Sequence, residues 1–443
     1  MIRTLIKNAK IINEMIQQES DLVIENNKIV EIANNINPKP DDLVIEAKGK
    51  YLLPGMIDDQ VHFREPGMPH KGKFLTESAA AVAGGITSVM DMPNTSPQTI
   101  TQQAIIDKHK LIAGMSHCNY GFYLGATNDN IADIKSIDTS LICGIKVFMG
   151  ASTGNMLVDN EKTLEQIFQH AQTLVATHCE YSPMIDDNEK AAKEKYGEDV
   201  PISQHPIIRS REACIKSTTT AMKLAKKHNA KLHVLHISTA EEVALFQQLP
   251  LDQKRITAEA CVHFTWFDNR DYEKLGTLIK CNPAVKQYSD KMAIIDGINY
   301  GNLDIIATDH APHTWDEKQN KYFTAPSGLP LVQTALASLL TQVNQGKFSI
   351  EKIVQKTAHN VADLFNVKKR GYIREGYYAD LVLVDMNKPN KVKSKKMLYQ
   401  CGWTPYDGEE FSASIEKTWV NGELKWSAGK LLGDANGQAL KYK

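Results

Sequence analysis

Short apolar runs alternate with helical patterns through most of this chain of 443 residues, beginning at residue 55. Runs rich in Ile, Val and Leu are typical of strands that a parallel sheet buries on both faces. The expected strands are Gly55–Phe63, Ile86–Met92, Asn119–Leu124, Leu141–Phe148, Leu174–Cys179, Lys231–Ile237, Ile256–Ala260 and Leu303–Thr308. The expected helices are Glu77–Ala83, Thr101–Ala113, Glu161–Ala171, Arg211–His228, Ala240–Gln248, Asp290–Tyr300 and Leu331–Val343. About eight such units predict an α/β fold, a closed (β/α)8 TIM barrel. The alternative is an open doubly wound sheet, but no glycine-rich phosphate-binding turn follows the first strand.

The two ends of the chain differ from the middle. Residues 1–53 and 370–426 hold short alternating runs, and Asn421-Gly422 between two apolar runs is a hairpin signal. Neither end could bury a core alone, so we expect both to form one small β-sandwich domain beside the barrel. Two independent additions are the alternative. The predicted organisation is 1–54 for the first part of the small domain, 55–365 for the barrel, and 366–443 for the second part.

Histidines and an aspartate follow several of the predicted strands. His62, His178, His236 and Asp309 stand at the carboxyl ends of four strands, and His263 follows another. Barrel enzymes place their active residues at these ends, so the side chains would share one mouth. Any one of these residues alone would more often be structural. Together they form a donor set suited to a metal ion.

Two cationic residues are expected in apolar surroundings. Side chains alternate across a strand, so Gln60, His62 and Arg64 should share one face. A buried Arg64 needs an anion, which either a protein carboxylate or a ligand supplies. Lys146 lies between Ile145 and Val147. It either snorkels to solvent, pairs with an acid, or reacts with carbon dioxide to form a carbamate that binds metal.

Composition excludes several classes of protein. The formal net charge of −1 argues against a nucleic-acid binder, and no apolar run is long enough to span a membrane. The N-terminus lacks the apolar core and cleavage site of a signal peptide. Seven cysteines, an odd number without a Cys-x-x-Cys pair, indicate reduced thiols and a cytoplasmic protein.

Several motifs resemble the amidohydrolase superfamily, and more closely its class I-like dihydroorotases. They are Arg64-Glu65-Pro66-Gly67, Met92-Pro93-Asn94-Thr95, Cys281-Asn282-Pro283, Ala307-Thr308-Asp309-His310-Ala311-Pro312-His313, and a return strand of the small domain within 376–385. The resemblance covers nearly the whole chain and implies the metal-dependent amidohydrolase form of the barrel. Allantoinases typically have Asn where Arg64 stands, and dihydropyrimidinases lack the Arg-Glu-Pro-Gly run. Arg64 therefore favours a dihydroorotase, whose substrate carries a carboxylate.

The resemblance also implies a role for each candidate residue. Lys146, as an N6-carboxylated lysine, would bridge two zinc ions. His178 and His236 would complete one zinc site, while His62 and Asp309, with Gln60 beside them, would belong to the other. Asp309 is also the implied catalytic residue. The implied substrate-binding residues are Arg64, Asn94 and His313 for the carboxylate, Asn282 and the Ser327-Gly328 backbone for the ring amide, and His263. His205 and Arg209 match a family pattern, but a structural role suits them better.

The implied activity is that of a zinc-dependent hydrolase acting on cyclic amide C–N bonds. It is the reversible cyclisation of N-carbamoyl-L-aspartate to (S)-dihydroorotate and water, in de novo pyrimidine (UMP) biosynthesis. One alternative is a related cyclic amidase, allantoinase- or dihydropyrimidinase-like. Another is a catalytically silent subunit that supports aspartate transcarbamoylase. The resemblance leaves open a homodimer and an association with aspartate transcarbamoylase.

Two further expectations concern Gln60 and a loop. Gln60 stands where the family normally has His, and a neutral amide oxygen is a poorer zinc donor, so one or two ions could be bound. The segment Thr314–Tyr322 is long and polar and is predicted to be a mobile loop near the substrate.

Overall fold

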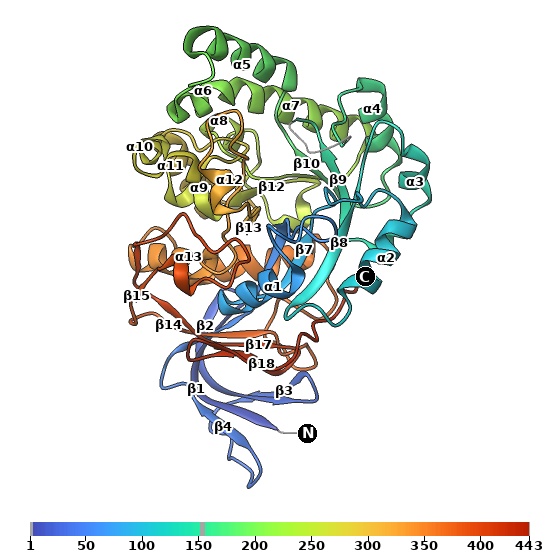
Figure 1. Cartoon of the computed structure of the whole chain (residues 1–443). Coiled ribbons are helices and arrows are strands. Elements are labelled where there is room, and N and C mark those ends of the chain that lie inside the picture. Colours follow the sequence, from blue (N-terminus) through green and yellow to red (C-terminus); the bar gives the residue numbers. More distant parts are fainter. Residues whose placement is uncertain (1–2, 151–155, 443) are drawn as a thin grey trace.

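Eight parallel strands stand side by side in sequence order at the centre of the computed structural model, which describes residues 3–150 and 156–442 (Figure 1). They are β6 (Met56–Val61), β7 (Ile86–Asp91), β8 (Asn119–Gly125), β9 (Gly144–Phe148), β10 (Val175–His178), β11 (Leu232–Val234), β12 (Ile256–Cys261) and β13 (Ile305–Ala307). Each coincides with an expected apolar run to within a few residues. The predicted barrel is confirmed.

The seam between the first and last barrel strands depends on one side chain. An isolated bridge joins Val61 to His310, and the backbone N–H of His62 donates to the carbonyl of His310 at 2.7 Å. The carboxylate of Asp58 accepts hydrogen bonds from the backbone N–H of Thr308 at 3.1 Å and from its hydroxyl at 2.6 Å. Asp58 is fully buried, and burial raises its pKa to about 7. A buried carboxyl group thus replaces part of the missing backbone ladder between β6 and β13.

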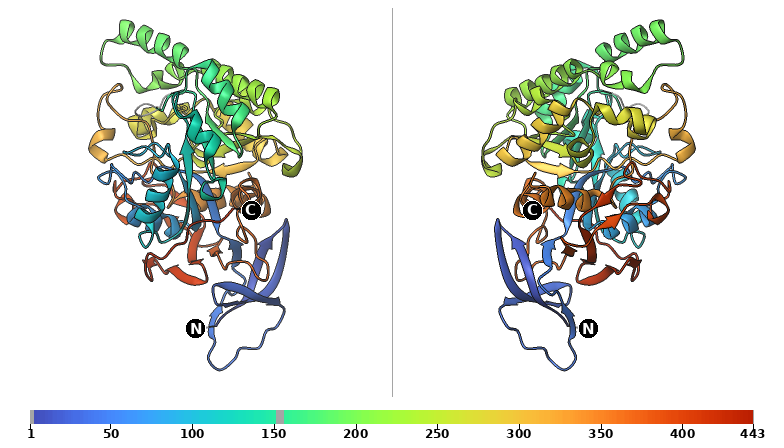
Figure 2. Two further views of the ribbon diagram at one scale, coloured as in Figure 1. Left: turned by 90° about the vertical axis from the view of Figure 1, so that its right-hand side faces the viewer. Right: turned by 90° about the vertical axis from the view of Figure 1, so that its left-hand side faces the viewer.

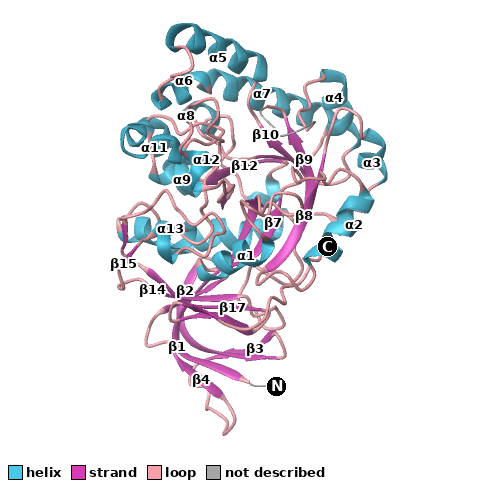
Figure 3. Cartoon of the chain, in the orientation of Figure 1, coloured by secondary structure: helices cyan, strands magenta, loops and turns pink. Residues whose placement is uncertain are grey.

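Helices surround the barrel (Figure 3). They include α1 (Phe74–Ala83), α2 (Gln102–Ile112), α3 (Ile131–Ser136), α4 (Glu161–His170), α7 (Arg211–His228), α8 (Ala240–Val243), α11 (Tyr288–Tyr300) and α13 (Ala335–Asn344). Helix α8 is shorter than the predicted 240–248. Two helices without a counterpart in the prediction, α5 (Ser182–Tyr196) and α6 (His205–Ile208), follow β10 and extend to the top of Figure 1. Along α5 only Ile185 and Ala192 are buried, so its sequence carries no apolar stripe that would reveal it.

Both ends of the chain contribute to one separate nine-stranded sheet, as predicted. Its order is β19-β18-β17-β14-β5-β1-β2-β3, with β4 paired to β1. The N-terminal strands are β1 (Thr4–Asn13), β2 (Ile16–Glu25), β3 (Lys28–Ala33), β4 (Leu43–Glu46) and β5 (Tyr51–Pro54). The C-terminal strands are β14 (Leu381–Asp385), β17 (Ser414–Val420), β18 (Glu423–Ser427) and β19 (Lys430–Leu431). Leu22, Leu52, Leu381 and Trp419 pack in one apolar cluster, so each end completes the core of the other.

The last residues of the chain leave this sheet. Asn436 and Ala439 form bridges to Ser116 and Tyr120 of the barrel, and the C-terminus lies beside the barrel in Figures 1 and 2. The N-terminal strands lie at the opposite end of the molecule from α5 (Figure 2). The predicted unit 366–443 therefore includes a segment that contacts the barrel.

Two findings bear on the expectations from composition. All seven cysteines are free thiols, and six of them are buried. Within residues 3–150 and 156–442, no helix is long and apolar enough to cross a membrane.

Candidate functional site

A cavity of about 480 Å³ opens at the carboxyl ends of the barrel strands. Most of the residues singled out in the sequence line it: Gln60, His62, Arg64, Asn94, Lys146, His178, His236, Asn282, Asp309, His313, Ser327 and Gly328. His263 is not among the lining residues. It is buried, and its charge lowers the pKa of Asp309. The structure thus brings together side chains from distant parts of the sequence, whose individual roles remain proposals.

The end of β6 departs from simple alternation. Gln60, His62 and Arg64 all line the cavity, but β6 ends at Val61, and its pairing with β7 shifts register between Asp58 and Val61. Arg64 has a positive φ of 69°. The common orientation therefore comes from an irregular strand end rather than from the regular strand expected over Gly55–Phe63. Such irregularities re-aim side chains next to active sites.

Backbone strain accumulates at the mouth of the barrel. His236 (φ 42°) and Asp309 (φ 52°) share the left-handed conformation with Arg64. A non-glycine residue in this region costs on the order of 1–3 kcal/mol, and such residues cluster at active sites. Each of these residues follows a barrel strand, so the strained backbone lies where the side chains turn into the cavity.

Four side chains present electron pairs to one another in the cavity. His178 Nε2 contacts Glu180 Oε2 at 2.9 Å, so this nitrogen carries the proton and Nδ1 faces His236 Nε2, also at 2.9 Å. His62 Nε2 lies 3.2 Å from Asp309 Oδ1. Two nitrogens, or a nitrogen and a carboxylate, can approach so closely only with a proton or a cation between them. The donor set and its orientation fit a metal ion held by histidine and carboxylate.

Gln60 lies beside this set. Its Nε2 donates to Asp309 Oδ1 at 3.1 Å. Its Oε1 is buried and has no hydrogen-bond partner among the described residues. A buried carbonyl oxygen without a partner is costly, so this atom is available to a ligand or to an ion.

Lys146 is almost fully buried, with 1% of its surface exposed. Its Nζ lies 4.7 Å from the centre of the Phe148 ring, and burial lowers its pKa to about 8. No carboxylate lies within 4.0 Å of Nζ in the described part of the chain. Because Lys146 is buried, its amine does not snorkel to solvent. Because no described carboxylate lies near Nζ, the amine forms no salt bridge. A lowered pKa also leaves a useful fraction of neutral amine, the form that reacts with carbon dioxide.

Arg64 is buried at the same mouth. Its Nε donates to the carbonyl of Pro312 at 3.1 Å, and one terminal nitrogen lies 3.1 Å from His313 Nε2. Burial lowers its pKa to about 10, so it remains charged at neutral pH. The residues that the structure describes place no carboxylate within 4.0 Å of its guanidinium. Of the two anion sources expected from sequence, the ligand is the one that fits.

Sequence reasoning missed the partner of His178. Glu180 is fully buried, and its Oε2 accepts from Arg209 at 3.0 Å as well as from His178. Burial opposes ionisation, but Arg209 and His178 hold the pKa of Glu180 well below its usual range. A carboxylate that fixes the tautomer of a metal-binding histidine is a common supporting interaction. Its position two residues after His178 was the available signal.

The segment Thr314–Tyr322 has polar anchors that its sequence did not indicate. It contains the short helix α12 (Trp315–Lys318), and Lys318 is fully buried, with Nζ donating to the carbonyls of Lys280, Pro326 and Gly328. The Tyr322 hydroxyl contacts His205 Nδ1 at 2.9 Å. The expectation of mobility rested on a lack of apolar anchors, whereas polar contacts of Lys318 and Tyr322 anchor the segment; its mobility stays a prediction.

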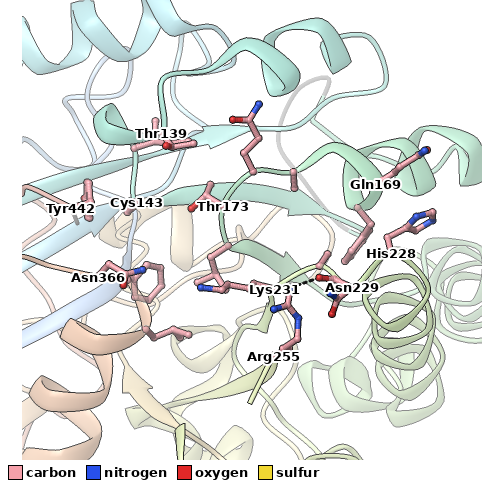
Figure 4. A pocket seen from close by; sticks show the side chains of 18 residues that line it. Thr139, Cys143, Gln169, Thr173, His228, Asn229, Lys231, Arg255, Asn366 and Tyr442 are labelled. Carbon is pink, nitrogen blue, oxygen red and sulfur yellow. Dashed lines mark hydrogen bonds between the residues drawn. The ribbon is translucent and has the colours of Figure 1, made fainter. Parts of the chain in front are cut away.

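A second cavity, of about 290 Å³, lies at the other end of the barrel (Figure 4). Thr139, Cys143, Thr173, Lys231 and Arg255 line it, each preceding a barrel strand. No residue of the predicted site lines this cavity. The candidate site residues therefore line the cavity at the carboxyl ends of the strands and not the one at the other end.

Comparison with known proteins agrees with this geometry. Residues 51–425 match the amidohydrolase family. The chain belongs to that family. It is 32% identical to a dihydroorotase of Methanosphaera stadtmanae over 96% of both chains, and 34% identical to a dihydroorotase of Halobacterium salinarum over 87% of this chain and 89% of that one. Among solved structures of the amidohydrolase family, an L-hydantoinase (dihydropyrimidinase) from Arthrobacter aurescens superimposes with a TM-score of 0.94 at 25% identity, covering 100% of both chains.

We expect Arg209→Leu to destabilise the protein by about 3 kcal/mol at neutral pH, because breaking a buried ion pair leaves Glu180 uncompensated. The folded-state pKa of Glu180 lies below its ordinary value of 4.5. The stabilisation is therefore fully present above pH 4.5 and is lost as the pH falls toward the folded-state pKa. Urea denaturation of both proteins at several pH values should show a difference that is largest at pH 7 and shrinks below pH 4.5.

Lys321→Leu is the matched control. Lys321 pairs with Asp199 at 2.6 Å, but both side chains are more than half exposed. Its loss should change stability far less than the loss of Arg209, because exposed ion pairs contribute little. Equal losses in the two variants, or a difference independent of pH, would contradict the account.

Proposed function

We propose that this chain is a zinc-dependent dihydroorotase that interconverts N-carbamoyl-L-aspartate and (S)-dihydroorotate in pyrimidine biosynthesis. The observation that carries the proposal is Arg64. Its buried guanidinium faces a cavity with no protein carboxylate within 4.0 Å among the described residues. Dihydroorotate carries a carboxylate, and a planar guanidinium binds that group through two parallel hydrogen bonds. The names of the archaeal relatives support the same activity.

In this proposal the metal ligands are Lys146 as a carbamate, His178, His236, His62 and Asp309. Zinc bound there would polarise the scissile carbonyl and lower the pKa of the attacking water. Glu180 and Arg209 would not bind the metal themselves. Glu180, paired with Arg209, holds the Nε2 proton of His178 and leaves Nδ1 free to bind metal.

Asp309 is proposed to move the proton. Burial would raise its pKa, but His62, His236 and His263 hold it at about 2, so Asp309 is a carboxylate at neutral pH. In hydrolysis it accepts a proton as water adds to the ring carbonyl. It then delivers that proton to the amide nitrogen as the C–N bond breaks. In cyclisation it protonates the departing hydroxyl.

The rest of the cavity is proposed to hold the ring and its carboxylate. Arg64, Asn94 and His313 would bind the carboxylate. Asn282 Oδ1 is buried without a partner in the described chain, so it offers an acceptor to a ring N–H. At Gly328 (φ 145°) a Cβ would lie 2.4 Å from the Ala311 carbonyl, so glycine lets the backbone pass close to Ala311. The Ser327-Gly328 segment, which lines the cavity, is proposed to meet the substrate amide. His263, which is buried and does not line the cavity, would support Asp309.

Two other functions stay as alternatives. A related cyclic amidase, allantoinase- or dihydropyrimidinase-like, is consistent with the likeness to the L-hydantoinase structure. A silent subunit supporting aspartate transcarbamoylase is motivated by Gln60. Assays of the purified protein with dihydroorotate, allantoin and dihydrouracil separate the three. A homodimer, an association with aspartate transcarbamoylase, and a cytoplasmic location remain predictions.

We expect Arg64→Lys to lower kcat/KM for dihydroorotate by about 2–3 kcal/mol, roughly 30- to 150-fold, because lysine cannot make the two-pronged contact. Hydrolysis of dihydrouracil, which lacks the carboxylate, should not fall by the same factor. The control is Arg270→Lys, since the Arg270 side chain is 67% exposed and pairs with Asp268. Equal losses with both substrates would show that Arg64 is structural.

Lys146→Ala should lose bound zinc and activity, and a short carboxylic acid such as propionate should restore part of both by replacing the carbamate. Lys356→Ala is the matched control, since Lys356 is also buried and burial lowers its pKa to about 8, but it lies outside the cavity. Propionate should have no effect on that variant. Full zinc content and activity in Lys146→Ala would end the carbamate proposal.

Gln60→His should tighten the zinc site formed by His62 and Asp309, because imidazole is a better zinc donor than an amide oxygen. Stepwise chelation of the wild type should remove the ion beside Gln60 first and the ion beside His178 later. In the variant the two steps should merge. A wild type that loses both ions in one step would mean that Gln60 ligates well. A protein with one zinc at this site and full activity would reject the two-metal arrangement.

A further inference from the structure

A second group of metal-binding side chains lies inside the barrel, below the candidate site. Asp59 of β6, His233 of β11 and Glu259 of β12 are each fully buried. Their nearest ligand atoms lie within 4.8 Å of one another. Glu259 Oε1 accepts the backbone N–H of His236 at 2.9 Å, which places the group directly beneath a residue of the cavity. None of the three lines the cavity itself.

The atoms that converge in this group have no hydrogen-bond partners in the described part of the chain. Both carboxylate oxygens of Asp59, Glu259 Oε2 and His233 Nε2 are buried and unpartnered among the described residues. The nearby hydroxyl of Tyr123 donates to the backbone carbonyl of Asp59 at 3.0 Å, not to its carboxylate. The charge of Glu259 raises the pKa of Lys146, but the two charged groups lie more than 4.0 Å apart. Buried polar atoms without partners are rare, and three of these, one from each residue, lie within 4.8 Å of one another and call for a common partner.

The hydrogen bonds around His233 determine which of its nitrogens is free. The Thr257 hydroxyl donates to the carbonyl of Leu232 at 3.3 Å, so its oxygen accepts from His233 Nδ1 at 2.8 Å. The proton of a neutral imidazole therefore stays on Nδ1. Nε2 then carries a lone pair, and this lone pair faces two carboxylates. Such a tautomer, fixed by a neighbouring oxygen, is the arrangement of a histidine that binds metal.

The separations match metal ligands better than hydrogen bonds. His233 Nε2 lies 3.5 Å from Asp59 Oδ2 and 3.9 Å from Glu259 Oε2. A protonated imidazole would approach a carboxylate to about 2.7–2.9 Å. Two ligands at about 2.0–2.2 Å from one zinc ion are about 3.0–3.6 Å apart at the usual angles. The shorter separation falls inside this range, and the longer one exceeds it by a few tenths of an ångström.

We propose that Asp59, His233 and Glu259 form a cation site inside the barrel, separate from the candidate active site. One imidazole nitrogen and two carboxylates suit a divalent transition-metal ion such as zinc. The second oxygen of Asp59 offers a fourth donor. The ion would neutralise two buried carboxylates and tie β6 to β11 and β12. The proposal does not rest on the proposed enzymatic function.

Metal analysis of the full-length protein tests this site. The wild type is loaded with zinc, freed of excess metal by gel filtration and measured by mass spectrometry. Asp59→Asn and Glu259→Gln should each contain one zinc equivalent less than the wild type. Asp91→Asn is the control, because Asp91 is equally buried but already paired with Lys108 at 2.5 Å, and it should keep the full content. The double variant His178→Asn/His236→Asn should retain the equivalent that Asp59→Asn removes.

Anomalous scattering from wild-type crystals at the zinc edge provides a measurement that needs no variant. A peak between Asp59, His233 and Glu259 is expected, distinct from any peak beside His178 and His236. The absence of that peak from zinc-loaded crystals, or an unchanged zinc content in Asp59→Asn, would overturn the proposal. The group would then hold protons instead of metal. Failure to turn over dihydroorotate would leave the metal count untouched, so the two proposals fail separately.

Discussion

Closure of the barrel by Asp58 is the constraint on which the rest of the structure depends. The first and last strands share few backbone contacts, and the buried carboxyl group of Asp58 bridges them by binding Thr308. Asp309 follows Thr308 directly, and Gln60 and His62 follow Asp58. The seam therefore sets the separation between His62 and Asp309, one of the two pairs that face each other across the cavity. β6 changes register at the same place, where the buried Asp59 and the cavity-lining Gln60 follow Asp58.

Lone pairs that face one another are the common feature of the barrel interior. In the upper layer His178 faces His236 and His62 faces Asp309. In the layer below, His233 faces two carboxylates. A low-dielectric interior penalises each of these arrangements unless positive charge lies between the partners. The family resemblance accounts for a metal in the upper layer, whereas only the geometry points to one in the lower layer.

The barrel strands could be predicted well from the sequence, but the contacts that hold the site residues in place could not. Apolar runs located the barrel strands, and the polar residues that end them, such as His178 and Asp309, could be named because strand ends meet at one mouth. Glu180 with Arg209, and Thr257 behind His233, could not be paired, because those contacts join residues far apart in the chain. Helix α5 has no apolar stripe, since it buries few side chains. Arg64 lines the cavity, but the expectation for its side chain relied on a regular strand, and β6 ends before Arg64.

The position of β5 in the small sheet has a consequence for synthesis on the ribosome. β5 (Tyr51–Pro54) lies between β1 and β14 (Leu381–Asp385), so one of its edges has no partner until the whole barrel has been translated. Strand edges left open are sites of aggregation, and pairings between distant segments form slowly. The barrel can begin to assemble while β5 still lacks its second partner strand. The nascent chain should therefore be most vulnerable just before residue 381 emerges, and most dependent on chaperones at that stage.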